Sequence, residues 1–400
     1  MIPRDAASSI KHIGLLFGIA AIGAACSPAA KTEPQGYDDL ANLGAHADIL
    51  TWTPAQQLAG YRNMDRITPT RVIPAGSRPF PLPERPLDLS GVSYEVEGET
   101  FDLAGFRGHN RVVGLLVIKD GEIVFEEYDQ GNTPQSRWMS FSIAKSVVSL
   151  LLGAAIREGH IESLDAPVTD YLPDLEDTSY EGVTLRNALQ MASGVEWNED
   201  YADPGSDVST SRGTAAERIR FLGARPRVAP PGDRFNYNTG ETHLVGGVVR
   251  AAVGGDLSSY LSQKIWKPFG MEADAYWQLV EPGGAEHGGC CISATLRDYG
   301  RIGLFALREG VLSDGTAVLP EGWMAESTTP SKANQGYGYL WWLSDTGAYR
   351  ALGIFGQAIF IDPEEKLVIV THGAWPRATG KDLAAHRAAF FEAVTEAVAH

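Results

Sequence analysis

A serine and a lysine stand three residues apart at the start of the apolar segment "SFSIAKSVVSLLLGAAI", residues 140–156. If the segment is helical, Ser142 and Lys145 lie on one face of it. Burial among apolar neighbours lowers the pKa of a lysine towards neutrality, and a neutral amine can activate a serine hydroxyl. Unpaired N–H groups at a helix start also favour developing negative charge. The pattern therefore predicts Ser142 as a nucleophile and Lys145 as its base.

The alternative for Lys145 is a side chain that extends from a half-buried helix to the solvent. The spacing alone does not decide between these interpretations, because Ser8 and Lys11 repeat it within the N-terminal apolar segment. A second motif is therefore needed.

That second motif is "PPGDRFNYNTGETHLVGGVV", residues 230–249, where a turn precedes a glycine-rich apolar helix. A tyrosine held near Lys145 can relay a proton from the nucleophile to a leaving group, so Tyr237 is a catalytic candidate. Asn238 and Thr239 are polar neighbours that can orient it. The alternative is that Tyr237 is a core aromatic residue in a loop.

A third element, "ALGIFGQAIFID" at residues 351–362, places Gly353 and Gly356 at a strand edge. Glycines there commonly mark the close approach of a ligand or of another backbone. Acyl transfer needs two N–H donors for the oxyanion. Ser142 and Ile354 are the candidates for these donors, unless the glycines only bend the strand.

The elements around these motifs predict an α/β (α+β) fold. "RVVGLLVIKDGEIVFEEY", residues 111–128, is typical of a β-hairpin turning at Asp120-Gly121, and the Lys145 helix ends near Gly159. A turn-rich, mainly helical region follows over about 160–310. Strands then return in "YGYLWWL", "ALGIFGQAIFID" and "KLVIVTHGA", before a closing helix from about 381 to 399.

We expect an antiparallel sheet flanked by helices, with an inserted helical lobe. One domain would span 51–400, its sheet lobe formed by about 51–159 and 311–400 and its helical lobe by about 160–310. Sites tend to form in the cleft between such lobes.

The N-terminus has the features of an export signal. Ile13 to Ala25 is an apolar run that is too short to cross a bilayer, and small residues precede Cys26. This pattern predicts a signal peptide over 1–25, lipidation at Cys26 and a tether over 26–50. The protein would be a cell-envelope lipoprotein that touches the membrane only through its lipid anchor. A secretory signal with a chance cysteine is the alternative.

Composition argues against several function classes. The net charge is −17, which disfavours nucleic-acid binding. The nine histidines have no metal-ligand spacing, no G-x-S-x-G elbow occurs, and no cofactor motif is present. The neighbours Cys290 and Cys291 are expected to be small buried residues rather than a disulfide, because adjacent Cα atoms lie closer than the usual disulfide range. A strained disulfide between the two neighbours is the alternative.

Together, the three motifs resemble those of the serine hydrolases with a class C β-lactamase-like, or penicillin-binding-protein-like, fold. Ser142 to Lys145 matches the S-x-x-K motif of that family, and residues 237–239 match its Y-x-N motif, with Thr239 in place of asparagine. The resemblance covers about residues 50–398. It implies a β-lactamase-like fold, an acyl-enzyme mechanism through Ser142, Lys145 and Tyr237, and an oxyanion hole formed by Ser142 and Ile354.

Within the family, "WTPAQQLAGYRNMDRI" and "ASGVEWNEDYADPGSD" are most similar to the 6-aminohexanoate-dimer hydrolases. This resemblance implies a small amide or ester substrate and no cofactor. It also implies that Tyr201 binds the scissile amide nitrogen, with Thr239 and Gly353 as further substrate-binding residues. No K-T-G or H-x-G triplet precedes the last strands, which disfavours β-lactamase and D,D-peptidase activity. A carboxylesterase and a non-catalytic binding lipoprotein remain as alternatives.

Four acidic residues surround Tyr201: Glu199, Asp200, Asp203 and Asp207. They either line the mouth of the cleft and attract an amine-bearing substrate, or form an ordinary solvated loop.

Overall fold

The computed structural model describes residues 39–399. The predicted signal peptide, Cys26 and the first part of the predicted tether lie outside the described residues. The rest of that tether is folded: η1 (Asp39–Asn42) and η2 (His46–Thr51) are short 3₁₀ helices. Asp39 forms an ion pair of 2.6 Å with Arg62 of α1 (Pro54–Arg62), so the folded part begins before residue 51.

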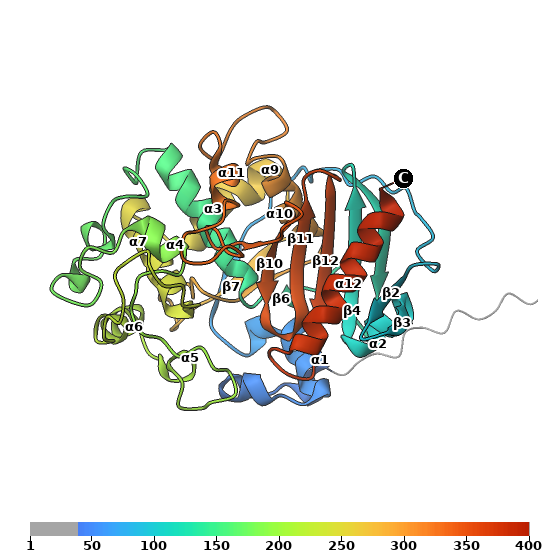
Figure 1. The fold of residues 1–400 in the computed structure, drawn as a ribbon, viewed down its shortest axis with the longest axis horizontal. Helices are drawn as coiled ribbons and strands as arrows, with labels where there is room; N and C mark the ends of the chain where they lie inside the picture. Colours follow the sequence, from blue (N-terminus) through green and yellow to red (C-terminus); the bar gives the residue numbers. More distant parts are fainter. Residues whose placement is uncertain (1–38, 400) are drawn as a thin grey trace, which may run out of the picture. The chain divides into compact units, whose positions relative to one another are not determined.

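A six-stranded antiparallel sheet carries the fold, with strand order β5-β4-β12-β11-β10-β9 (Figure 1). Its strands are β4 (Val112–Lys119), β5 (Glu122–Tyr128), β9 (Trp342–Leu343), β10 (Tyr349–Gly353), β11 (Gln357–Asp362) and β12 (Leu367–Gly373). The predicted hairpin at Asp120-Gly121 is confirmed. Both residues have positive φ, 54° and 84°, as a tight two-residue turn requires.

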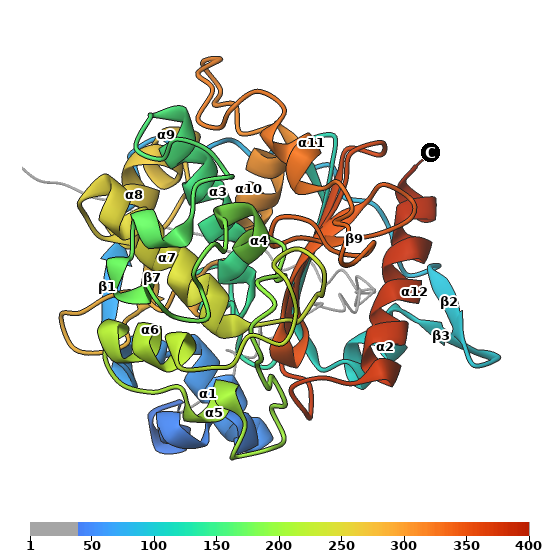
Figure 2. The same ribbon diagram turned by 60° about the vertical axis from the view of Figure 1, so that its left-hand side comes forward.

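Helices cover both faces of this sheet, as predicted. Alternate side chains of the strands point to opposite faces, so that Leu116 and Ile118 pack in one core while Leu115 and Val117 pack in the other. The first core includes α3 (Ile143–Arg157) and α10 (Leu296–Leu307), and the second includes α12 (Lys381–Val398) and α2 (Leu103–His109). Figure 2 shows α12 on one side of the sheet and α3 and α10 on the other.

The region from 160 to 310 is mainly helical, and it also contributes strands. Besides α10, its α-helices are α4 (Leu185–Leu189), α5 (Asp207–Thr210), α6 (Ala215–Gly223), α7 (Thr239–Val253), α8 (Leu257–Leu261) and α9 (Lys267–Phe269). A second sheet has the order β1-β7-β8-β6, formed by β1 (Thr70–Ile73), β7 (Ala275–Gln278), β8 (Ile292–Ala294) and β6 (Trp138–Met139). The pairing of β6 with β8 joins the segment before Ser142 to the segment after Cys291.

Two remaining strands, β2 (Ser93–Val96) and β3 (Glu99–Asp102), form a hairpin. Helix α11 (Trp323–Ser327) precedes the segment "YGYLWWL", where the strand prediction was largely wrong. Leu340 has φ 63°, and its N–H donates to the carbonyl of Leu189 at 3.0 Å. The backbone there bonds to the helical region instead of continuing a strand, and only β9 remains.

Across residues 39–399, no helix has both the length and the apolar character needed to cross a membrane.

Candidate active site

The site begins where β6 turns into α3. Ser142 is the N-cap residue of α3, its side chain makes no capping hydrogen bond, and it is 8% exposed. The preceding turn is fixed to β8, because the N–H of Ser140 donates to the Ile292 carbonyl at 2.7 Å and the Ser140 hydroxyl accepts the Ile292 N–H at 3.0 Å. Phe141, between Ser140 and Ser142 in the chain, has φ 46°, a conformation that non-glycine residues adopt rarely.

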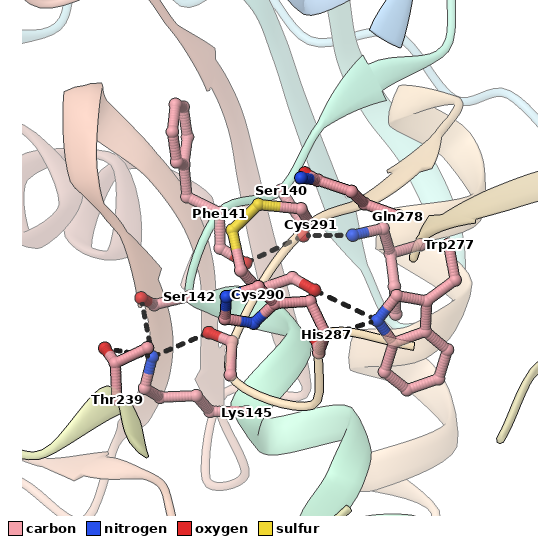
Figure 3. The surroundings of a disulfide bond; sticks show 12 residues. Ser140, Phe141, Ser142, Lys145, Thr239, Trp277, Gln278, His287, Cys290 and Cys291 are labelled. Atoms are coloured by element: carbon pink, nitrogen blue, oxygen red, sulfur yellow. Dashed lines mark hydrogen bonds between the residues drawn. A yellow bond between two sulfur atoms is a disulfide. The ribbon is translucent and has the colours of Figure 1, made fainter. Parts of the chain in front are cut away.

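Lys145 points into the protein and not into solvent. Its side chain is 1% exposed, and Nζ lies 3.0 Å from Ser142 Oγ, 3.0 Å from Thr239 Oγ1 and 2.6 Å from the carbonyl oxygen of Gly289 (Figure 3). The structure thus brings together three residues that the sequence singled out, from the start of α3 and the start of α7.

Burial lowers the pKa of Lys145 to about 8, and the negative charge of Glu199 opposes that shift. Roughly a tenth of the lysine is therefore a neutral amine at pH 7, and this fraction increases as the pH rises through 8.

Glu199 is a site residue that sequence reasoning did not separate from its acidic neighbours. Its carboxylate accepts hydrogen bonds from the Tyr201 hydroxyl at 2.6 Å, the Thr239 N–H at 3.0 Å, the Thr239 hydroxyl and the Trp197 indole. A chain of contacts thus runs from Glu199 through Thr239 to Lys145. Nothing in the local pattern distinguishes Glu199 from Asp200; the difference lies in the direction of the side chain.

The other acidic residues of that loop point elsewhere. Asp207 pairs with Arg225 at 3.0 Å, while Asp200 and Asp203 accept the N–H groups of Ala202 and Gly205. None of them lines the cleft around Ser142.

Tyr237 lies beside Lys145, with Nζ 5.3 Å from its ring centroid, and its ring stacks on Trp342. Burial, reinforced by Glu199, raises the pKa of Tyr237, and hydrogen bonding to Ser142 opposes this increase. Its hydroxyl therefore keeps its proton near neutral pH. Asn238 is fully buried and caps α7 by accepting the Glu241 N–H at 3.0 Å.

Gly353, at the end of β10, approaches a backbone more closely than any side chain would allow. A Cβ atom there would lie 2.3 Å from the carbonyl oxygen of Ser140. This contact places Ile354 beside the turn that carries Ser142. Ile354 and Ser142 both line the same two cavities. Gly353 also lines one of them.

An aromatic cluster supports the two backbone segments. Phe355 follows Ile354 with φ 60°, just as Phe141 precedes Ser142 with φ 46°. The two rings lie 5.3 Å apart, and the buried Tyr61 of α1 packs against them at 5.9 and 5.2 Å. We refer to Tyr61, Phe141 and Phe355 as the aromatic support.

The cleft has two compartments that meet at Ser142, Tyr201 and Ile354. One, of about 370 Å³, is the polar compartment, lined by Thr239, His46, His287, Arg212 and Arg218 among others. The second, of about 600 Å³, is the apolar compartment, lined by Tyr237, Trp342, Leu352, Gly353 and Trp375 among others.

The prediction for the two adjacent cysteines was wrong. Cys290 and Cys291 form a disulfide at the wall of the polar compartment (Figure 3). Their Cα atoms lie 3.6 Å apart, and Cys291 adopts φ 85°, a backbone conformation that sequence spacing does not reveal. The preceding Gly289 presses on α7, where a Cβ would lie 2.7 Å from the Thr239 carbonyl oxygen.

Rival catalytic groups are not assembled at the serine. His243 lines a separate hollow that Ser142 does not reach, and no histidine hydrogen-bonds Ser142 within the described chain. Within residues 39–399 no three His, Cys, Asp or Glu side chains are grouped so as to hold a metal ion.

Comparison with known proteins assigns the family. Residues 99–391 match the family described as Beta-lactamase. The chain is 30% identical over 288 residues to 6-aminohexanoate-dimer hydrolase of Paenarthrobacter ureafaciens, covering 66% of this chain and 72% of that one. The chain therefore belongs to the β-lactamase family of serine hydrolases, as its motifs predicted.

Solved structures agree on the fold. A protein of Bacillus anthracis, described as "Putative 6-aminohexanoate-dimer hydrolase", superposes with a TM-score of 0.76 at 22% identity, over 86% of this chain and 94% of that one. A penicillin binding protein of Bacillus halodurans superposes with a TM-score of 0.58 at 19% identity, over 73% and 98%. The predicted fold class is confirmed.

The close approach of Gly353 to Ser140 yields a prediction. Gly353→Ala should push β10 away from the Ser142 turn and lower kcat/KM for ester hydrolysis by about a hundredfold, because small displacements at a reacting centre are costly. Gly108→Ala is the control, since a Cβ there meets nothing within 4 Å. Equal activity of the two variants would contradict the assignment of this contact to the site.

Proposed function

We propose that this protein hydrolyses small linear amides or esters through an acyl-enzyme on Ser142. The observation that carries the proposal is the buried Lys145, whose Nζ lies 3.0 Å from the Ser142 hydroxyl. A neutral amine has two N–H donors and one lone pair. The Gly289 carbonyl and the Thr239 hydroxyl accept the two N–H groups, which leaves the lone pair for the proton of Ser142.

In acylation, Ser142 Oγ bonds to the substrate carbonyl carbon while its proton passes to Lys145 Nζ. The resulting oxyanion is stabilised by the N–H groups of Ser142 and Ile354. Collapse of this adduct breaks the C–N or C–O bond. Tyr237 donates its proton to the departing amine or alcohol and recovers one from Lys145. Water then attacks the acyl-enzyme, and its proton returns to Ser142 by the same groups.

Tyr201 supports the choice of amides among the substrates. Its hydroxyl proton is donated to Glu199, so the lone pairs of its oxygen are available to accept the N–H of a scissile amide. The similarity to a 6-aminohexanoate-dimer hydrolase points in the same direction. An esterase without an amidase role is the second candidate, favoured by the wide apolar compartment.

β-Lactamase and D,D-peptidase activities have less support. The strand that would carry the cationic triplet is β10, which reads "YRALG". A non-catalytic binding role has no observation in its favour, because Ser142, Lys145 and Tyr237 are all present and close together.

For the location of the protein, we propose export as a lipoprotein anchored through Cys26, on the sequence pattern alone.

The nucleophile and base are tested by covalent labelling. A fluorophosphonate probe should modify Ser142 alone, as judged by peptide mapping, and Ser142→Ala should not react. Lys145→Ala should slow labelling by about a hundredfold or more, because the general base is lost. Lys332→Ala, at an exposed ion pair with Asp233, is the control. Labelling at another serine, or full reactivity of Lys145→Ala at pH 7, would refute the proposal.

The pH dependence follows from the lysine. Because the neutral amine is the active form, kcat/KM for a neutral ester should rise with pH to a plateau, with an apparent pKa of about 8. The charge of Glu199 raises the pKa of Lys145, so Glu199→Gln should shift the profile to lower pH. Asp200→Asn should leave it in place, because the Asp200 carboxylate accepts the Ala202 N–H and the pKa of Lys145 responds to Glu199. A shift to higher pH in Glu199→Gln would contradict this coupling.

The proton relay is tested by comparing leaving groups. Tyr237→Phe should slow hydrolysis of an alkyl amide at least about tenfold more than that of a p-nitrophenyl ester, because nitrophenolate departs without a proton. Tyr171→Phe is the control, because it removes a hydroxyl that accepts the Glu162 N–H and lines neither compartment. Equal losses on both substrates would assign Tyr237 a packing role.

Adding nitrocefin, a D-alanyl-D-alanine peptide and the linear 6-aminohexanoate dimer to the substrate panel would separate the candidate functions.

A further inference from the structure

The side chains that line the cleft around Ser142 include several cations, although the chain carries a net charge of −17. The Glu199 carboxylate hydrogen-bonds Tyr201 and Thr239 without itself lining either compartment. Within the described residues, neither compartment is lined by an aspartate or a glutamate. The polar compartment contains Arg212 and Arg218, and the apolar compartment contains Lys381 and Arg387. Such a lining attracts anions.

Among these cations, Arg218 is the one best placed to bind an anion. It lies on α6 and is half-buried. Its Nε and Nη1 donate to the carbonyls of Gly213 and Ser211, at 3.0 and 2.8 Å. These bonds fix the guanidinium plane, while Nη2 has no hydrogen-bond partner among residues 39–399. An arginine whose Nε and Nη1 are held by carbonyls can offer the N–H groups of Nη2 to a carboxylate or phosphate.

No carboxylate in the described chain compensates Arg212 or Arg218. By contrast, Arg225, which follows α6, pairs with Asp207 at 3.0 Å. Arg212 donates to the Ser209 carbonyl at 2.8 Å and is otherwise exposed. Burial and the nearby charge of Arg212 lower the pKa of Arg218 to about 10. Two like charges thus lie close together without a counter-ion.

The histidines around Arg218 are uncharged, so they add no positive charge to the compartment. Burial, followed by the positive charge of Arg218, lowers the pKa of His243 and His287. Burial, followed by the charges of Arg212 and Arg218, also lowers the pKa of His46. Neutral imidazoles can donate a hydrogen bond to a bound anion without forming a competing ion pair.

The polar compartment also brings this cation to the reacting centre. His287 lies 3.5 Å from Arg218 Nη1, and its carbonyl accepts the Cys290 N–H at 2.9 Å. The intervening Gly289 accepts the hydrogen bond of Lys145. Figure 3 shows His287 beside Cys290, near Ser142 and Lys145. An anionic group at Arg218 and a scissile carbonyl at Ser142 therefore fit one compartment of about 370 Å³.

We infer that the substrate is an amide or ester carrying a carboxylate or similar anionic group, and that Arg218, assisted by Arg212, binds that group in the polar compartment. The inference rests on the proposed hydrolase function and names its substrate class. It favours the charge opposite to that of an amine-bearing substrate.

Two matched substrate pairs test it, one with the charge on the acyl side and one on the leaving-group side. They are mono-p-nitrophenyl glutarate against p-nitrophenyl pentanoate, and N-acetyl-4-aminobutyrate against N-butylacetamide. At low salt, kcat/KM should favour the anionic member of at least one pair by about tenfold or more, and salt should reduce that ratio. Arg218→Ala should abolish the preference, and Arg218→Lys should retain part of it.

The exposed Arg220 lies on the same helix but outside both compartments, so Arg220→Ala is the control and should keep the wild-type ratio. A structural role of Arg218 would lower both members of a pair equally. The inference is overturned if neither pair shows a charge preference, if the preference survives in Arg218→Ala, or if only Arg387→Ala abolishes it.

A binding measurement separates this inference from the hydrolase proposal. By calorimetry, glutarate should bind Ser142→Ala more tightly than glutaramide does, and the additional Arg218→Ala change should remove the difference. Binding without any hydrolysis would support the anion site and refute the proposed activity. Hydrolysis with no charge discrimination in either assay would refute the anion site alone.

Discussion

The burial of one amine is the constraint on which the rest of the site depends. Keeping Lys145 away from water lowers its pKa from 10.5 to about 8, a penalty on the charged form on the order of 3 kcal/mol. The surrounding elements limit that penalty. Helix α7 contributes Thr239, the loop after β7 contributes the Gly289 carbonyl, and Glu199 adds a compensating charge through Thr239. The basicity of the lysine is therefore set by three segments far apart in the chain.

The parts of the site that were predictable are those encoded by local patterns. The spacing of Ser142 and Lys145 within an apolar helix, the turn before Tyr237 and the glycines around Ile354 are each visible in short segments. The strand pair β4–β5 was predictable for the same reason, because Asp120-Gly121 specifies its turn. Such local patterns can be recognised in the sequence without knowledge of the tertiary structure.

The remaining features depend on side-chain directions and on long-range contacts. Glu199 and Asp200 are adjacent acids, yet only the first turns towards Thr239. Arg218 reads as a surface residue of an amphipathic helix, and its position in the cleft follows from how α6 is placed. The segment before β9 has a strand-like composition, but the Leu340 N–H bonds to the Leu189 carbonyl of the helical region. Such outcomes are decided by tertiary packing, which single-sequence patterns do not describe.

The aromatic support gives the N-terminal helix a role in the accuracy of the site. The amides of Ser142 and Ile354, which would bind the proposed oxyanion, each adjoin a phenylalanine with left-handed backbone angles. Tyr61 of α1 packs against both phenylalanine rings. The separation of these amides is thus controlled from outside the cleft. A substitution at Tyr61 would therefore act on the geometry of the site from a residue that lines neither compartment.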